Sequence, residues 1–199
     1  MGVWRHLSAN GQEFISLMPF FLYVYVPLET WGPNFKLGVQ QVQKNHNTMG
    51  KTIYILSCTS TKDKDAKTVE TLYTGPMFVK GLAYAKRHHA KHILVIGGVC
   101  KSEVYELSDK ASFYDGLDIK ELHKADRLKL AKKRLVSLKA KGCDTENDKF
   151  IFLTGQSYYE FLLADQRNAL PDAIKHYELP FRENELKGNG DINHFLDNN

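Results

Sequence analysis

Small polar side chains follow an apolar run near the start of the main part of the chain. Ser57, Cys58 and Thr59 come directly after Thr52–Leu56, and Lys62 lies a little further on. Hydroxyls, a thiol and backbone N–H groups at such a turn can bind a phosphate, a carboxylate or the edge of a nucleobase. The alternative is that these side chains only form hydrogen bonds with the backbone of the turn. Cys58 as a nucleophile would also need a base placed beside it.

A second group follows the next apolar run. Gly97 and Gly98 end that run, and glycines there let the backbone turn sharply or come close to a ligand. Tyr114 and Asp115 lie downstream in a loop-like stretch. Over a nucleobase pocket, Tyr114 could stack on a base, and Asp115 could orient a water or stabilise a cationic sugar transition state. An ordinary loop explains the same residues.

A third group lies between an apolar run and a predicted helix. Gly155, Gln156 and Tyr158 stand here, and Ser157 with Glu160 forms the capping-box pattern that predicts a helix start at Ser157. Backbone N–H groups at a helix start attract anions and base edges. Gln156 could then read a base edge and Tyr158 could stack. The capping box by itself accounts for Ser157.

Basic residues are concentrated in two segments. The predicted helix at 119–141 includes Lys132 and Lys133, and the segment 80–92 includes Lys86 and Arg87. Such faces attract nucleic-acid phosphates, although a charge run more commonly marks a solvated helix face. The net charge of +4 is compatible with DNA as the partner.

The sequence argues against several other classes of protein. Its three cysteines are widely spaced and odd in number, which indicates reduced thiols in the cytoplasm. His88, His89 and His92 have no acidic or cysteine partner at ligand spacing, so we expect no metal site. No cofactor signature is present, and we expect no cofactor. The apolar stretch 14–26 is too short to span a membrane, for which about 20 residues are needed.

The elements that must position these residues alternate along the chain. Apolar runs predict strands, and periodic stretches predict helices, with an irregular segment at 99–116. The predicted strands span 52–58, 92–98, 149–155 and 176–180, the last of them at an edge because of its proline; the predicted helices span 77–89, 119–141 and 157–169. This order predicts a three-layer α/β fold with a mainly parallel four-stranded sheet and helices on both faces.

The first 48 residues differ from the rest and leave two interpretations open. They are either an N-terminal extension, packing aromatic residues against the α/β domain at 49–199, or an upstream addition before an original start at Met49. In the first case the packing residues would be Phe20, Phe21, Tyr23 and Tyr25.

Four segments between 51 and 181 resemble a known group of small prokaryotic and phage domains. The segments are Leu-Ser-Cys-Thr-Ser-Thr-Lys62, Leu72-Tyr-Thr-Gly-Pro-Met-Phe78, Phe152-Leu-Thr-Gly-Gln-Ser-Tyr-Tyr-Glu-Phe-Leu162 and Leu179-Pro-Phe181. This group is similar to the bacterial peroxide-stress DNA-binding proteins. The first segment also resembles the middle domain of archaeosine synthase, whose sheet is like that of uracil-DNA glycosylase. The resemblance implies that fold.

The chain departs from this group after the second strand. The group usually continues with Ser-Ala-Lys-Tyr-Gly-Leu and a Pro-Tyr-Asp element, whereas this chain has Gly-Gly-Val-Cys-Lys-Ser at 97–102 and keeps only Tyr114-Asp115. The pocket wall is therefore expected to differ.

The resemblance and the basic segments together predict a glycosylase-like enzyme that acts on a modified base in DNA, in the setting of phage–host conflict. Asp115 is the first candidate for the catalytic carboxylate and Asp63 the second. Two alternatives are a DNA-binding stress or repair protein without catalysis, and an enzyme of nucleotides or nucleosides.

Overall fold

The computed structural model describes residues 3–7, 13–17, 50–98, 103–116 and 119–199. The chain divides into two units, Met1–His46 and Asn47–Asn199. In the first, β1 (Val3–Leu7) pairs antiparallel with β2 (Glu13–Leu17). The aromatic residues predicted to pack onto the main domain lie outside the described residues; they are Phe20, Phe21, Tyr23 and Tyr25.

The second unit is built on a five-stranded sheet with the order β5-β4-β3-β6-β7. All four predicted strands are present and run parallel, with β7 at an edge as its proline indicated. They are β3 (Thr52–Ser57), β4 (His92–Ile96), β6 (Lys149–Leu153) and β7 (His176–Glu178). Their apolar runs match strands that are covered on both faces.

A fifth strand makes the sheet mixed, so the prediction of four strands was wrong on this point. β5 (Val104–Glu106) pairs antiparallel with β4 and lies inside the segment predicted to be irregular. It has only three residues, and Val104 is the only buried one. Such a short strand has no alternation long enough to be recognised in the sequence.

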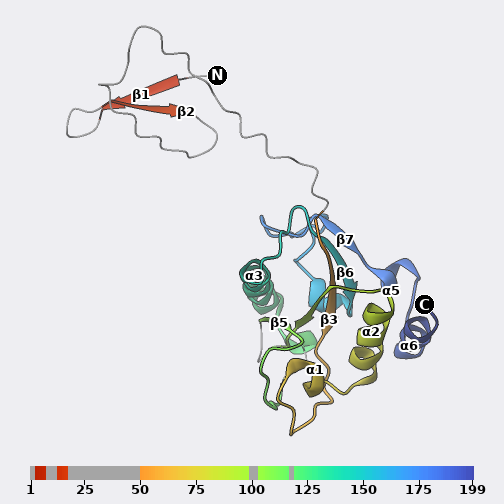
Figure 1. Ribbon diagram of the computed structural model, residues 1–199. Coiled ribbons are helices and arrows are strands. Elements are labelled where there is room, and N and C mark those ends of the chain that lie inside the picture. The colour runs from red at the N-terminus through yellow and green to blue at the C-terminus, as the bar shows by residue number, and fades with distance from the viewer. Residues whose placement is uncertain (1–2, 8–12, 18–49, 99–102, 117–118) are drawn as a thin grey trace. The chain divides into compact units, whose positions relative to one another are not determined.

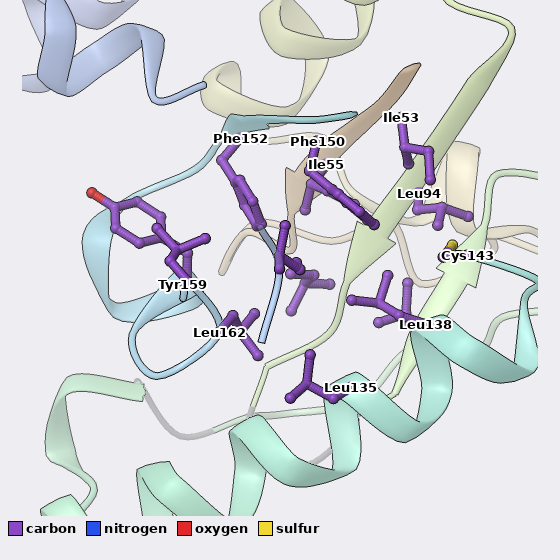
Figure 2. Packing of buried hydrophobic residues seen from close by; sticks show 14 of the residues in the cluster. Ile53, Ile55, Leu94, Leu135, Leu138, Cys143, Phe150, Phe152, Tyr159 and Leu162 are labelled. Carbon is purple, nitrogen blue, oxygen red and sulfur yellow. The ribbon is translucent and has the colours of Figure 1, made fainter. Parts of the chain in front are cut away.

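Helices cover both faces of the sheet, as predicted (Figure 1). One face carries α3 (Lys124–Ala140), and the other carries α2 (Pro76–Arg87) with α6 (Asn189–Asn198). Alternate side chains of β3 point to opposite layers. Figure 2 shows Ile53 and Ile55 on the side of α3, where they share a core with other buried residues such as Leu135, Leu138, Phe150 and Phe152.

Two helix predictions need correction. The stretch 119–141 is split into a short 3₁₀ turn, Ile119–Glu121, and α3, which ends before Gly142 in the left-handed region. The helix predicted at 157–169 is only α4 (Gln156–Tyr159), and its N-cap is Gly155. Phe161 has a positive φ of 67°, which ends the helix and turns the next apolar residues, Leu162 and Leu163, into the core. Tertiary burial therefore overrides the local capping signal.

Three short helices complete the second unit: α1 (Val69–Leu72), α5 (Pro180–Glu183) and the C-terminal α6. α6 was not predicted as a helix, and its Leu196 is fully buried in the layer that contains α2. Within the described ranges, no helix combines the length and the apolar character needed to cross a membrane.

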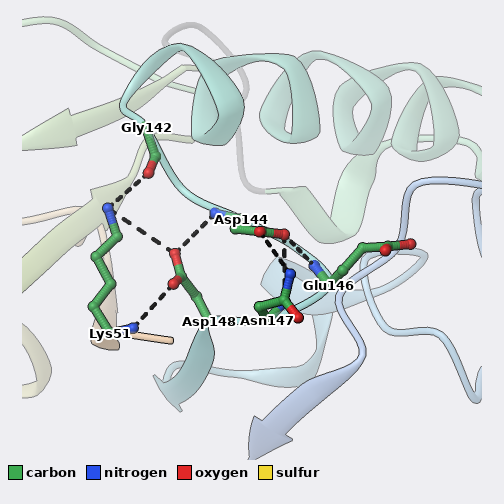
Figure 3. A network of polar contacts seen from close by, with 6 residues as sticks. All are labelled: Lys51, Gly142, Asp144, Glu146, Asn147 and Asp148. Atoms are coloured by element: carbon green, nitrogen blue, oxygen red, sulfur yellow. Dashed lines mark hydrogen bonds and ion pairs between the residues drawn. The ribbon is translucent and has the colours of Figure 1, made fainter. Parts of the chain in front are cut away.

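A buried carboxylate joins the starts of β3 and β6 (Figure 3). One oxygen of Asp148 accepts the backbone N–H of Lys51 at 3.0 Å, and the other accepts that of Asp144 at 2.8 Å. The Lys51 ammonium donates to the carbonyl of Gly142 at 2.7 Å and lies 4.0 Å from Asp148. These contacts fix the amino ends of the two strands, opposite the carboxyl ends where the candidate site lies.

Replacing Asp148 with alanine should therefore destabilise the second unit. Two partly buried N–H groups would lose their acceptor, which costs about 2–4 kcal/mol in total. The matched control is Asp172→Ala, which removes an exposed carboxylate paired with Lys139 at 2.8 Å and should cost less than about 1 kcal/mol. Urea unfolding of both variants measures the difference. Equal stabilities would show that the Asp148 contacts do not hold the strands.

Candidate functional site

The topology places the switch point of the sheet between the carboxyl ends of β3 and β6. From β3 the chain passes through α2 to β4 on one side, and from β4 it passes through α3 to β6 on the other side. Ligands of open α/β sheets bind where the strand order reverses in this way. Cys58 follows β3 here, and Gly155 follows β6.

Residues from all three predicted groups meet at this place. The Sγ atom of Cys58 lies 3.3 Å from the hydroxyl oxygen of Tyr158, and that hydroxyl donates to the carbonyl oxygen of Cys58 at 3.3 Å. Gly98, after β4, also lies close to the thiol, because a Cβ atom added there would lie 3.2 Å from the Cys58 sulfur. The carboxyl ends of β3, β4 and β6 therefore converge on one thiol.

Tyr114 also contacts Cys58, and together with Cys58 and Tyr158 it forms what we call the wall of the site. Its hydroxyl lies 2.9 Å from that of Tyr73, which is buried. The Lys62 ammonium lies 4.5 Å from the centre of the Tyr114 ring, within the range of a cation–π contact. The predicted residues Lys62 and Tyr114 are thus brought together, although they are far apart in the sequence.

One residue of the site escaped the sequence reasoning. Arg134 belongs to the predicted basic helix at 119–141, whose charges were expected to face phosphates or solvent, but it is only 1% exposed. Its Nη1 donates to the carbonyl of Tyr158 at 3.0 Å, and its Nη2 donates to that of Gly97 at 2.8 Å. A signal was available, because Arg134 falls on the same helical stripe as Ala131, Leu135 and Leu138, which is the core face of α3.

The charge of Arg134 is not balanced by a carboxylate from the part of the chain that the structure describes. Among the described residues, no aspartate or glutamate forms an ion pair with it, and its Nε has no hydrogen-bond partner. Burial lowers the pKa of Arg134 to about 10, so it remains a cation at neutral pH. A buried, hydrogen-bonded cation without a counter-ion gives the site a positive potential.

Cys58 responds to two opposing effects. Burial raises the pKa of its thiol, whereas the hydrogen bond with Tyr158 and the charges of Arg134 and Lys62 lower it. Burial prevails, so Cys58 is a neutral thiol at neutral pH. Its neighbours are nevertheless those that would stabilise a negative charge at this position.

The other predicted binding residues lie around this centre in supporting roles. Ser57 is buried, and the hydroxyl of Thr59 donates to the carbonyl of Thr61 at 3.0 Å. Thr59 also packs against Gly75, where an added Cβ would lie 2.8 Å from the Thr59 side chain. Gly155 and Gln156 are exposed at the start of α4.

The two candidate carboxylates have different surroundings. Asp63 accepts the backbone N–H of Asp65 at 2.9 Å and so holds its own turn. Asp115 is exposed and directly follows Tyr114. Both carboxylates are exposed, and Asp63 directly follows Lys62, but of these two described residues only Asp63 has a backbone partner of its own within its turn.

The predicted phosphate contacts do not form one surface. Lys86 pairs with Glu70 at 2.7 Å, and Arg87 donates to the carbonyl of Leu196 in α6. Lys132 and Lys133 are exposed on α3, which covers the opposite face of the sheet. Among the described residues, no three or more histidine, cysteine, aspartate or glutamate side chains lie together in a way that could hold a metal ion.

The role of Arg134 can be tested by Arg134→Met. Two carbonyls would lose charge-assisted hydrogen bonds, while the cost of burying the charge would disappear. We expect a net loss of about 2–4 kcal/mol in the free energy of unfolding. Lys133→Met, on the exposed side of the same helix, should change it by no more than about 0.5 kcal/mol. A fully stable Arg134→Met variant in urea unfolding would contradict the structural role.

The surroundings of Cys58 predict the effect of Tyr158→Phe. This change removes a hydrogen bond that lowers the pKa of the thiol, so the pKa should rise further. The rate of alkylation by iodoacetamide at a fixed, mildly alkaline pH should then fall. Peptide-resolved mass spectrometry separates Cys58 from Cys100 and Cys143. An unchanged pH profile would show that Tyr158 does not contact the sulfur in solution.

Comparison with known proteins gave one match. Neither the curated proteins nor the solved structures that were searched contain a match to the chain. A family model matches residues 53–186, a span that includes the five strands of the sheet, except Thr52 at the start of β3, and every residue of the site described above. Because this span is well over half of the 199 residues, the chain belongs to the family described as a family of unknown function, DUF6884.

Proposed function

We propose that this protein is a DNA glycosylase-like enzyme that removes a modified base from DNA by hydrolysing its N-glycosidic bond. The observation that carries the proposal is the buried cation of Arg134, which has no ion-pair partner among the described residues and lies behind Cys58 and Tyr158 of the wall. In this reaction the base departs with the electron pair of the broken bond. A fixed positive potential at the place where negative charge develops lowers the barrier.

The fold supports the same proposal. The four parallel strands have the order β4-β3-β6-β7 and lie between helical layers, which agrees with the uracil-DNA-glycosylase-like fold implied by the sequence resemblance. The site lies at the switch point of this sheet. The antiparallel β5 is an addition at the edge beside β4 and leaves the switch point unchanged.

The chain's own residues can be given roles in this chemistry. Tyr158 and Tyr114 offer rings and hydroxyls to an extruded base, as in enzymes that flip bases out of the duplex. Lys62 is placed to meet a phosphate at the edge of the wall. Asp115 orients a water that attacks C1′ of the sugar and accepts its proton. The base leaves with the bonding electrons and is then protonated.

The alternative of a DNA-binding protein without catalysis depends on the basic helix faces instead. Two of those basic residues, Lys86 and Arg87, already have partners within the protein, and the other two lie on the opposite face. These contacts favour the site at the strand ends over the helix faces as the place of binding.

Asp115→Asn tests the proposed chemistry. Wild-type protein incubated with oligonucleotides that carry plain and modified bases should produce abasic sites with at least one modified base. The Asp115→Asn variant should release that base at least about 100-fold more slowly, because a general base is lost, while its DNA affinity stays unchanged.

Asp172→Asn serves as the control, because Asp172 is an exposed carboxylate that pairs with Lys139 of α3. This variant should retain the wild-type rate. Gel analysis after alkaline cleavage measures the product. DNA binding without release of any base would refute the enzyme and leave the non-catalytic alternative. Undiminished release by Asp115→Asn would remove Asp115 from the catalytic role.

A further inference from the structure

A small cavity opens beside Tyr114, next to the site at the strand ends. It has a volume of about 220 Å³, and its walls include Tyr73, Tyr105, Tyr114, Val69 and Leu72. Pockets for drug-sized ligands are typically about 300–1,000 Å³, so this one suits a single flat ring system. Tyr114 is common to the cavity and to the wall that contains Cys58.

The walls are mostly aromatic and apolar, which favours a flat aromatic ligand, and Lys110 adds one cation to the lining. The hydroxyls of Tyr73 and Tyr114 bind each other at 2.9 Å, and that of Tyr105 donates to Glu103 at 3.2 Å. These contacts fix the three rings. Burial raises the pKa of Tyr114 to about 12 and also raises that of Tyr105, so the phenols stay neutral. Fixed, neutral aromatic rings bind flat heterocycles such as nucleobases by stacking or edge contacts.

The loops around the cavity add aromatic rings paired with lysines. Phe113 is 37% exposed, although large apolar side chains are mostly buried in this unit, and the Lys64 ammonium lies 5.8 Å from its ring centre. Lys62 lies over the ring of Tyr114 in the same way. Rings for bases, interleaved with cations for phosphates, are the means by which proteins hold single strands.

We propose that this cavity receives an unstacked nucleobase that neighbours the base at the strand ends. The ligand is then a single-stranded or locally melted nucleic acid, since an intact duplex keeps its bases stacked inside. Phe113 stacks on a further base at the rim, and Lys62 and Lys64 meet the phosphates. This inference rests on the proposed function, because it places the target base beside Cys58.

Fluorescence anisotropy with labelled oligonucleotides tests the inference. Single strands, as DNA and as RNA, are compared with a duplex of the same sequence. The wild type should bind one of the single strands more tightly than the duplex. Phe113→Ala should weaken that binding by about 5- to 150-fold, which corresponds to the loss of one stacked base. Val79→Ala changes an apolar residue on α2 that is even more exposed than Phe113, and it should leave the binding unchanged.

A second variant tests the cavity itself. Ala111→Leu narrows the space between the tyrosines and should weaken single-strand binding without affecting the duplex. Thermal unfolding shows whether this variant is folded. If it is not, Phe113→Ala still decides the question, because its side chain is exposed. Equal binding of duplex and single strands, with no effect of Phe113→Ala, would overturn the inference.

The failure of this inference can be distinguished from that of the proposed function. Undiminished base release from fully paired DNA by Phe113→Ala would overturn the cavity assignment and leave the glycosylase proposal standing. Single-strand binding that depends on Phe113, without release of any base, would support the cavity and refute the enzyme. Preference for the DNA or the RNA strand identifies which sugar the natural ligand carries.

Discussion

The carboxyl-end edge of the sheet depends on two hydrogen bonds from one buried side chain. Arg134 reaches from α3 to the carbonyl of Gly97 after β4 and to that of Tyr158 in α4 after β6. Cys58, after β3, lies between them against the Tyr158 hydroxyl. Loops at the ends of three strands would otherwise be free to separate. The guanidinium fork is suited to this task because it donates in several fixed directions.

The same arrangement has an energetic cost that the fold alone does not require. A buried cation with no carboxylate partner among the described residues is costly to desolvate, and its two hydrogen bonds to carbonyls offset only part of that cost. The charge therefore makes more sense as part of a binding site than as part of the core. Its field acts on Cys58 and on whatever ligand lies beside it, in surroundings where charges are screened weakly.

Much of the fold could be predicted from the sequence, but less of the site. The long apolar runs of β3, β4 and β6 are unambiguous because both faces of these strands are buried. Glycines and small polar residues at their ends indicated where a site would form. The helix predicted after Ser157 failed because its residues are turned into the core by the positive φ of Phe161, which depends on tertiary packing. Arg134 was missed because its residue type suggested the surface, although its helical position pointed inward.

The basic helices illustrate how composition can mislead about a partner. The basic residues of α2 and α3 are the most conspicuous charges in the sequence, yet the sheet lies between these two helices. The two basic faces therefore cannot contact one strand of nucleic acid together. Exposed charges are also screened over a distance of about 8–10 Å at ordinary salt concentrations. Three cations at the candidate site are more important for the proposed binding than the many on the helix faces. Arg134 lies inside the protein, and Lys62 and Lys64 lie over the rings of Tyr114 and Phe113. In the proposed mode of nucleic-acid binding, aromatic rings held in place by hydrogen bonds contact the bases, and the nearby cations contact the phosphates.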